Sequence, residues 1–139
     1  MSPRMINLEG VPKALEIGDV PGLPEWRSIR TPGHSPGHVS FFRASDRTII
    51  AGDAVLTANY DSFFDFLTGR QVISRPPAPI TCDWNAARRS VEELAALDPA
   101  VLACGHGRPM AGPETAAKLR EFSRSFPAPA RGRYVTASA

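Results

Sequence analysis

A few residues of this chain have side chains and neighbours suited to chemistry. His34 and His38 lie in the segment TPGHSPGH (residues 31–38, the histidine turn), where two prolines and two glycines fix a compact turn. Asp53 follows a glycine at the end of a short apolar segment, and His106 lies between two glycines after another. Imidazoles held in this way are natural metal ligands or acid–base groups. Two imidazoles and a carboxylate suit zinc, iron or manganese.

The sharpest hypothesis is a catalytic metal ion held by His34, Asp53 and His106. Such an ion takes three protein ligands, keeps one position open and acidifies the water bound there. The neighbouring glycines would let the backbone pass close to a crowded centre. The alternative is that these are three unrelated polar residues. Spacing and composition alone do not favour the metal site over this alternative, because many folds can supply ligands at this spacing.

Strands and turns must position these residues. Alternation, β-branched residues and turn signals predict strands at 14–17, 26–30, 39–42, 48–51 and 100–104, with a hairpin turn at 44–47. The apolar strand 48–51 is expected to be buried. Asp53 and His106 then lie where a strand passes into a loop, which is where sites gather in layered α/β proteins.

Two helices follow from apolar periodicity. The first spans 83–97, with Asp83 as N-cap and an apolar face formed by Trp84, Ala87, Val91, Leu94 and Ala95. The second begins near Gly112 and Pro113 and runs to about 126. Phenylalanines within 63–67 suggest a short helix, and the proline-rich segment 75–79 should be extended. Residues 127–139 are expected to form a disordered tail.

Composition places the chain among ordinary globular proteins. Its 139 residues are 42% hydrophobic and 22% charged, which suits one domain with a real core. A net charge of +2, from 16 basic and 14 acidic residues, does not point to nucleic acid. No apolar run approaches the roughly 20 residues of a membrane span, and the first ten residues lack the apolar core of a signal peptide. Two cysteines give no disulfide framework, so a reduced cytoplasmic setting is expected.

The order of these motifs resembles the metallo-β-lactamase-fold hydrolases, glyoxalase II and its relatives among them. The histidine turn, then Gly52-Asp53, then Gly105-His106-Gly107 match the family's later motifs, and the resemblance covers about residues 26–125. It implies an α/β (α+β) fold, a mixed sheet with flanking helices, from an αββα sandwich of two similar halves. It also implies that His34 binds one metal ion, that Asp53 bridges two, and that His106 binds the second.

The chain departs from that family in lacking its first motif, His-x-His-x-Asp-His. All three histidines lie after residue 33, so the chain resembles the C-terminal half only. We therefore expect an N-terminal strand and loop segment over 1–25, a partial domain over 26–126 and the tail. His38 is expected to support the site rather than bind metal directly. At most one weakly held ion (zinc, iron or manganese) is expected per chain.

The expected function follows from these two points. Metal-activated water would attack an ester, thioester, lactone or phosphoester bond of a small molecule, with Asp53 as ligand and as a group that orients the water. The alternative is a catalytically inactive fragment or structural subunit that keeps part of the site. A half-sandwich exposes one sheet face, so we expect a homo-oligomer, a complementary N-terminal half as partner, or marginal stability.

Overall fold

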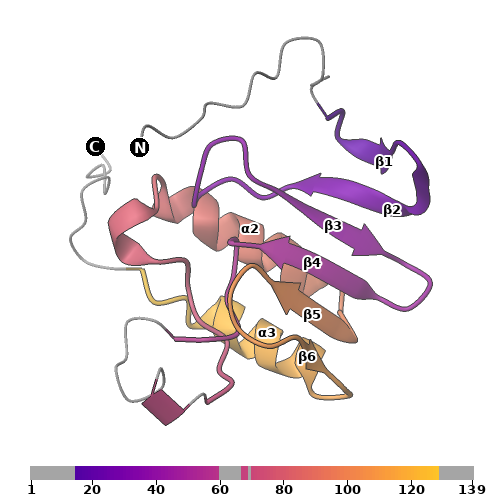
Figure 1. Cartoon of the computed structure of the whole chain (residues 1–139). Coiled ribbons are helices and arrows are strands. Elements are labelled where there is room, and N and C mark those ends of the chain that lie inside the picture. The colour runs from indigo at the N-terminus through magenta and orange to yellow at the C-terminus, as the bar shows by residue number, and fades with distance from the viewer. Residues whose placement is uncertain (1–14, 60–66, 69, 129–139) are drawn as a thin grey trace, which may run out of the picture.

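The computed structural model describes residues 15–59, 67–68 and 70–128. Within these residues a sheet carries its strands in sequence order (Figure 1): β1 (Gly18–Val20), β2 (Leu23–Arg30), β3 (Val39–Arg43), β4 (Thr48–Gly52), β5 (Val101–Cys104) and β6 (Met110–Ala111). Strands β4 and β5 are parallel, and the other neighbours are antiparallel. The predicted α+β class with a mixed sheet and flanking helices is confirmed.

The parallel pair requires a crossover, and helix α2 (Trp84–Ala96) supplies it. The carboxylate of Asp83 accepts a hydrogen bond from the Ala86 N–H at 2.9 Å, which confirms the predicted N-cap. Helix α3 (Thr115–Arg124) packs beside α2, and both cover the same face of the sheet (Figure 1). The other face carries neither of these helices.

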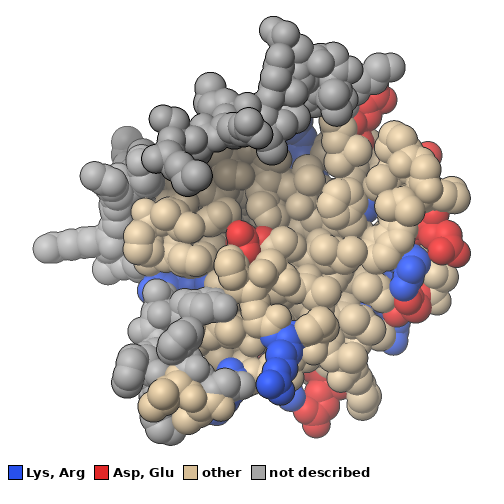
Figure 2. All heavy atoms as spheres, viewed as in Figure 1, with Lys and Arg blue, Asp and Glu red and all other residues tan. Residues whose placement is uncertain are grey.

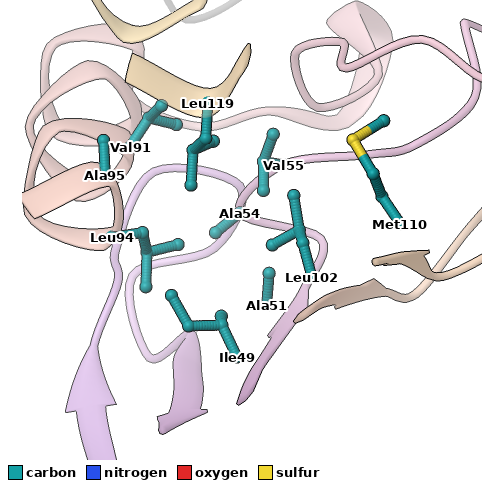
Figure 3. Close-up of a cluster of buried hydrophobic side chains, with 10 residues drawn as sticks. All are labelled: Ile49, Ala51, Ala54, Val55, Val91, Leu94, Ala95, Leu102, Met110 and Leu119. Atoms are coloured by element: carbon teal, nitrogen blue, oxygen red, sulfur yellow. The ribbon is translucent and has the colours of Figure 1, made fainter. Parts of the chain in front are cut away.

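The hydrophobic core lies between the sheet and these two helices. Figure 3 shows its side chains pointing toward one another from the strands, the helices and the segment after β4: Ile49, Ala51, Ala54, Val55, Val91, Leu94, Ala95, Leu102, Met110 and Leu119. A fully buried leucine, isoleucine or valine contributes about 1.5–3 kcal/mol to folding. This cluster therefore fixes the ends of β4 and β5, from which Asp53 and His106 follow.

Four details of the sequence-based prediction are wrong. Residues 15–17 are not a strand, and β1 begins at Gly18 because it pairs through the turn at 21–22 with β2. Strand β4 is not buried throughout, since the side chain of Ile50 is 42% exposed. Helix α3 begins at Thr115, two residues after Pro113, and Glu114 is its N-cap. One 3-10 turn, η1 (Ala78–Ile80), interrupts the segment expected to be extended.

Some predictions fall on parts of the chain that the structure does not describe. The short helix proposed within 63–67 lies outside the described residues except for Leu67, and the tail predicted over 127–139 lies outside them from residue 129. Among the helices that are described, none combines the length and the apolar character needed to span a membrane.

Candidate metal centre

The histidine turn is anchored to the start of helix α2. The N–H of Asp83 donates to the carbonyl of Gly33 at 2.9 Å, and the Ser90 hydroxyl donates to the carbonyl of Pro32 at 2.7 Å. Gly33 has φ +140°, and a Cβ there would lie 2.4 Å from the backbone of Ala87. Only glycine lets the turn approach the helix this closely. The turn therefore presents His34 from a fixed position.

Asp53 and His106 come together because β4 and β5 are parallel neighbours. Their carboxyl ends meet at one edge of the sheet, where the Gly105 N–H donates to the carbonyl of Gly52 at 2.7 Å. A Cβ on Gly105 would lie 2.3 Å from Oδ1 of Asp53. Glycine at this position thus lets the backbone pass close to the carboxylate of Asp53.

The carboxylate of Asp53 lies between two imidazoles. Nε2 of His34 is 3.8 Å from Oδ2, and Nε2 of His106 is 3.6 Å from Oδ1. The His34 side chain is 17% exposed, that of Asp53 28% and that of His106 51%. One histidine thus faces each carboxylate oxygen, and the centre is open to solvent on the His106 side.

Two polar atoms of this centre are buried without a hydrogen-bond partner among the described residues: Nδ1 of His34 and Oδ1 of Asp53. Such atoms are costly unless a further group binds them. Within the part of the chain that the structure describes, however, no three His, Cys, Asp or Glu side chains are arranged to hold one ion. The three predicted ligands therefore form two pairs that share Asp53. Their donor types are those that bind divalent metal ions.

His38 takes a different place from the other histidines. Its Nε2 accepts a hydrogen bond from the backbone N–H of Asp53 at 3.0 Å, and its Nδ1 lies 2.9 Å from Oγ1 of Thr31. Burial is the main cause that lowers the pKa of His38, followed by the charge of nearby His34. Both ring nitrogens of His38 are thus engaged within the protein.

Sequence reasoning missed Ser40, whose hydroxyl joins Thr31 to the carbonyl of Ala51. One signal was available: Ser40 is a polar residue on the side of β3 that faces the core, within the otherwise apolar run before Arg43. Cys104 lies two residues before His106 at the end of β5, where burial raises the pKa of its thiol to about 12 and keeps it protonated in the metal-free protein.

These motifs and this fold can be compared with known proteins. The family model that describes sequences of the metallo-beta-lactamase superfamily matches residues 8–106 of this chain. The chain belongs to this superfamily. Among curated relatives, the probable metallo-hydrolase YflN of Bacillus subtilis is 44% identical over 108 residues, which are 78% of this chain and 41% of YflN. The chain thus spans less than half the length of this relative.

Solved structures of the superfamily agree with the fold. A metallo-beta-lactamase superfamily protein of Sulfolobus tokodaii has a TM-score of 0.52 at 20% identity, over 82% of this chain and 38% of that one. TTHA1623, solved in a di-iron-bound form, has a TM-score of 0.50 at 26% identity, over 79% of this chain and 44% of that one. That similar protein thus binds two iron ions.

Proposed function

We propose that this chain carries one side of the catalytic centre of a metal-dependent hydrolase, with His34, Asp53 and His106 as metal ligands. One observation carries the proposal: each carboxylate oxygen of Asp53 faces the Nε2 atom of a different histidine within 4 Å. Oδ1 is also buried without a hydrogen-bond partner among the described residues. A carboxylate placed between two imidazoles in this way suits a bridging ligand.

The chemistry of such a centre is hydrolysis. A bound divalent ion supplies an acidified water and polarises the bond to be cleaved. The carboxylate of Asp53 would help to hold the ion and would orient the attacking water by accepting a hydrogen bond from it. His106, half exposed, lies on the side from which a small-molecule substrate enters. The reaction classes that we propose are hydrolysis of ester, thioester, lactone and phosphoester bonds.

The metal is proposed to be zinc, iron or manganese, because imidazole and carboxylate ligands suit all three. The di-iron-bound form of the similar protein TTHA1623 makes iron a candidate of equal rank with zinc. Both cysteines are free thiols, which agrees with a reducing compartment, and we propose the cytoplasm.

The centre is proposed to be completed by protein outside this chain. The ligand set is partial among the described residues. The chain also matches only 41% of YflN and 44% of TTHA1623. We propose that a segment corresponding to the unmatched part of these relatives supplies the further ligands and substrate contacts. The chain alone would hold at most one ion, weakly, and hydrolyse slowly.

The surface that such a segment would cover is the face of the sheet opposite the helices, which we call the open face. Phe41, Ile50 and Ala103 lie in one row across β3, β4 and β5 on this face, and Ile50 is 42% exposed. Figure 2 views this side and shows uncharged side chains over most of its centre, with charged ones mainly toward the rim. An apolar sheet face of this kind is typical of a sheet-on-sheet interface.

A test of the open face uses the unmatched part of YflN, expressed separately, as the probe. Analytical ultracentrifugation should show a complex with this chain, and Ile50→Lys should abolish it while leaving the thermal unfolding of the chain cooperative. A homodimer that Ile50→Lys dissociates would replace the proposed partner by a second copy. A stable monomer with a cooperative melt and no binding would refute both.

A second candidate function, a structural subunit that keeps ligand residues without catalysis, is favoured by the absence of a three-ligand group among the described residues. Two measurements separate the candidates: metal content after equilibration with Zn²⁺ or Fe²⁺, and hydrolysis of p-nitrophenyl ester, thioester, lactone and phosphodiester substrates. The hydrolase proposal expects bound metal and activity, and loss of both in Asp53→Asn. Metal-independent background rates in the parent would support the structural subunit.

A further inference from the structure

The backbone on both sides of Gly52 is held by side chains from another segment. The N–H of Asp53 donates to Nε2 of His38 at 3.0 Å, and the Ser40 hydroxyl donates to the carbonyl of Ala51 at 3.1 Å. Thr31 connects the two, because its Oγ1 lies 2.9 Å from Nδ1 of His38 and 2.7 Å from Oγ of Ser40. The hydrogen bonds thus run unbroken from the amide of Asp53 to the carbonyl two residues before it.

The direction of every hydrogen bond in this chain follows from its two ends. A backbone N–H can only donate, so Nε2 of His38 accepts and carries no proton. The neutral ring then has its proton on Nδ1 and donates it to Thr31. At the other end the carbonyl of Ala51 can only accept, so Ser40 donates to it and accepts from Thr31. All donors are used once, and one tautomer of His38 is specified.

The packing around this chain of hydrogen bonds is tight. Thr31 and Ser40 are fully buried. Gly52 has φ +54°, and a Cβ there would lie 2.7 Å from Nε2 of His38. Glycine is therefore required for the imidazole to reach the amide of Asp53. A buried set of hydrogen bonds with all members satisfied holds its backbone rigidly.

We propose that His38, as the Nδ1–H tautomer held by Thr31 and Ser40, is the positioning residue that fixes Asp53 between His34 and His106. It acts through the amide of Asp53 and is not itself a ligand, because its Nε2 is already occupied. The inference rests on the proposed metal centre, since positioning matters for the carboxylate that binds metal. Mutation of partners that orient metal ligands typically weakens metal affinity 10–100-fold.

The first test needs no metal. Long-range ¹H–¹⁵N NMR spectra of the metal-free protein should show His38 as the Nδ1–H tautomer. Thr31→Val keeps the shape of the buried side chain and removes the acceptor of the Nδ1 proton, so it should mix the two tautomers and shift the Asp53 amide resonance. A His38 ring protonated on Nε2 in the parent would overturn the inference.

The second test compares Zn²⁺ affinities by calorimetry. His38→Leu should bind Zn²⁺ at least about 10-fold more weakly than the parent, whereas His38→Gln, whose Oε1 can accept from the Asp53 amide, should recover most of the affinity. Thr31→Val, which should disturb the fold less than His38→Leu, should have a Zn²⁺ affinity between those of the two His38 variants. Equal affinity of parent, His38→Leu and Thr31→Val would overturn the inference and leave the proposed function standing. A parent that binds no Zn²⁺ while showing the expected tautomer would overturn both the metal centre and the positioning role.

Discussion

A methyl group added at Gly105 should separate metal binding from folding. Gly105 lies where β5 ends, and the position of its Cβ would be 2.3 Å from Oδ1 of Asp53 and 3.2 Å from Cγ. Ordinary van der Waals contact begins at 3.4 Å, so Gly105→Ala must push the carboxylate oxygen away by about 1.1 Å. The backbone of Gly105 is not in the left-handed region, so alanine adds no strain there.

The expected effect on metal binding is large because the ligand geometry of a metal site tolerates only about 0.2 Å. A shift of about 1.1 Å removes Asp53 from both imidazoles, and Zn²⁺ affinity should fall about 100-fold or more. The expected cost to stability is smaller, about 1–3 kcal/mol, since the group that moves is the end of a partly exposed side chain.

The assay is Zn²⁺ titration by calorimetry together with denaturant unfolding of the metal-free protein. Gly37→Ala is the matched control, because it makes the same change nearby at a position with no atom within 4 Å and without a positive φ. The control should keep the Zn²⁺ affinity of the parent and unfold at an equal or higher denaturant concentration. Unchanged Zn²⁺ affinity in Gly105→Ala would refute the assignment of Asp53 as a ligand.

Three further predictions concern the rest of the chain. Gly33→Ala should unfold at a lower denaturant concentration, by about 3 kcal/mol or more, because its Cβ would lie 2.4 Å from the backbone of α2 at φ +140°. Iodoacetamide at pH 8 should label Cys82 alone, because the pKa of the buried Cys104 thiol is about 12 and roughly one part in ten thousand of it is thiolate. Mass spectrometry of tryptic peptides measures the label on each cysteine, and equal labelling of the two would contradict the packing. The hydrogen bond from Arg43 lowers the pKa of Asp46 to about 2. The stability that this pair contributes is therefore present above pH 3.8, the pKa of the carboxyl in the unfolded chain, and is lost as the pH falls toward 2. NMR titration of Arg43→Gln should show a higher pKa for Asp46, and an unchanged pKa would count against the pair.

Much of this fold could be predicted because local patterns agree with tertiary packing. The helix capped by Asp83 has the apolar stripe that the core requires, and the strands at the histidine turn are bounded by strong turn residues. The exposure of Ile50 could not be predicted from its apolar neighbours. A short β-branched strand has the same sequence pattern whether one face or both faces of the sheet are covered. Which residues of the strand are exposed is decided by the position of the helices.

Some features of the candidate centre could also be predicted from the sequence, and others could not. Glycines beside Asp53 and His106 could be recognised in the sequence, because close backbone approach requires glycine. The pairing of one histidine with each carboxylate oxygen could not, since it depends on β4 and β5 being parallel neighbours. The link from Thr31 through Ser40 was also hidden, because serine and threonine occur in strands for many reasons.

The most direct test of the account is the metal content of the purified chain after equilibrium dialysis against Zn²⁺ and, separately, Fe²⁺. Elemental analysis should find a bound ion in the parent, and Asp53→Asn should lose it, because both histidine–carboxylate pairs depend on Asp53. His106→Ala should hold less metal than the parent, because it removes one of the two imidazoles that face this carboxylate. An Asp53→Asn variant that keeps the metal of the parent, or a parent that holds none at saturating concentration, would contradict the central claim that this carboxylate is the shared ligand of a metal centre.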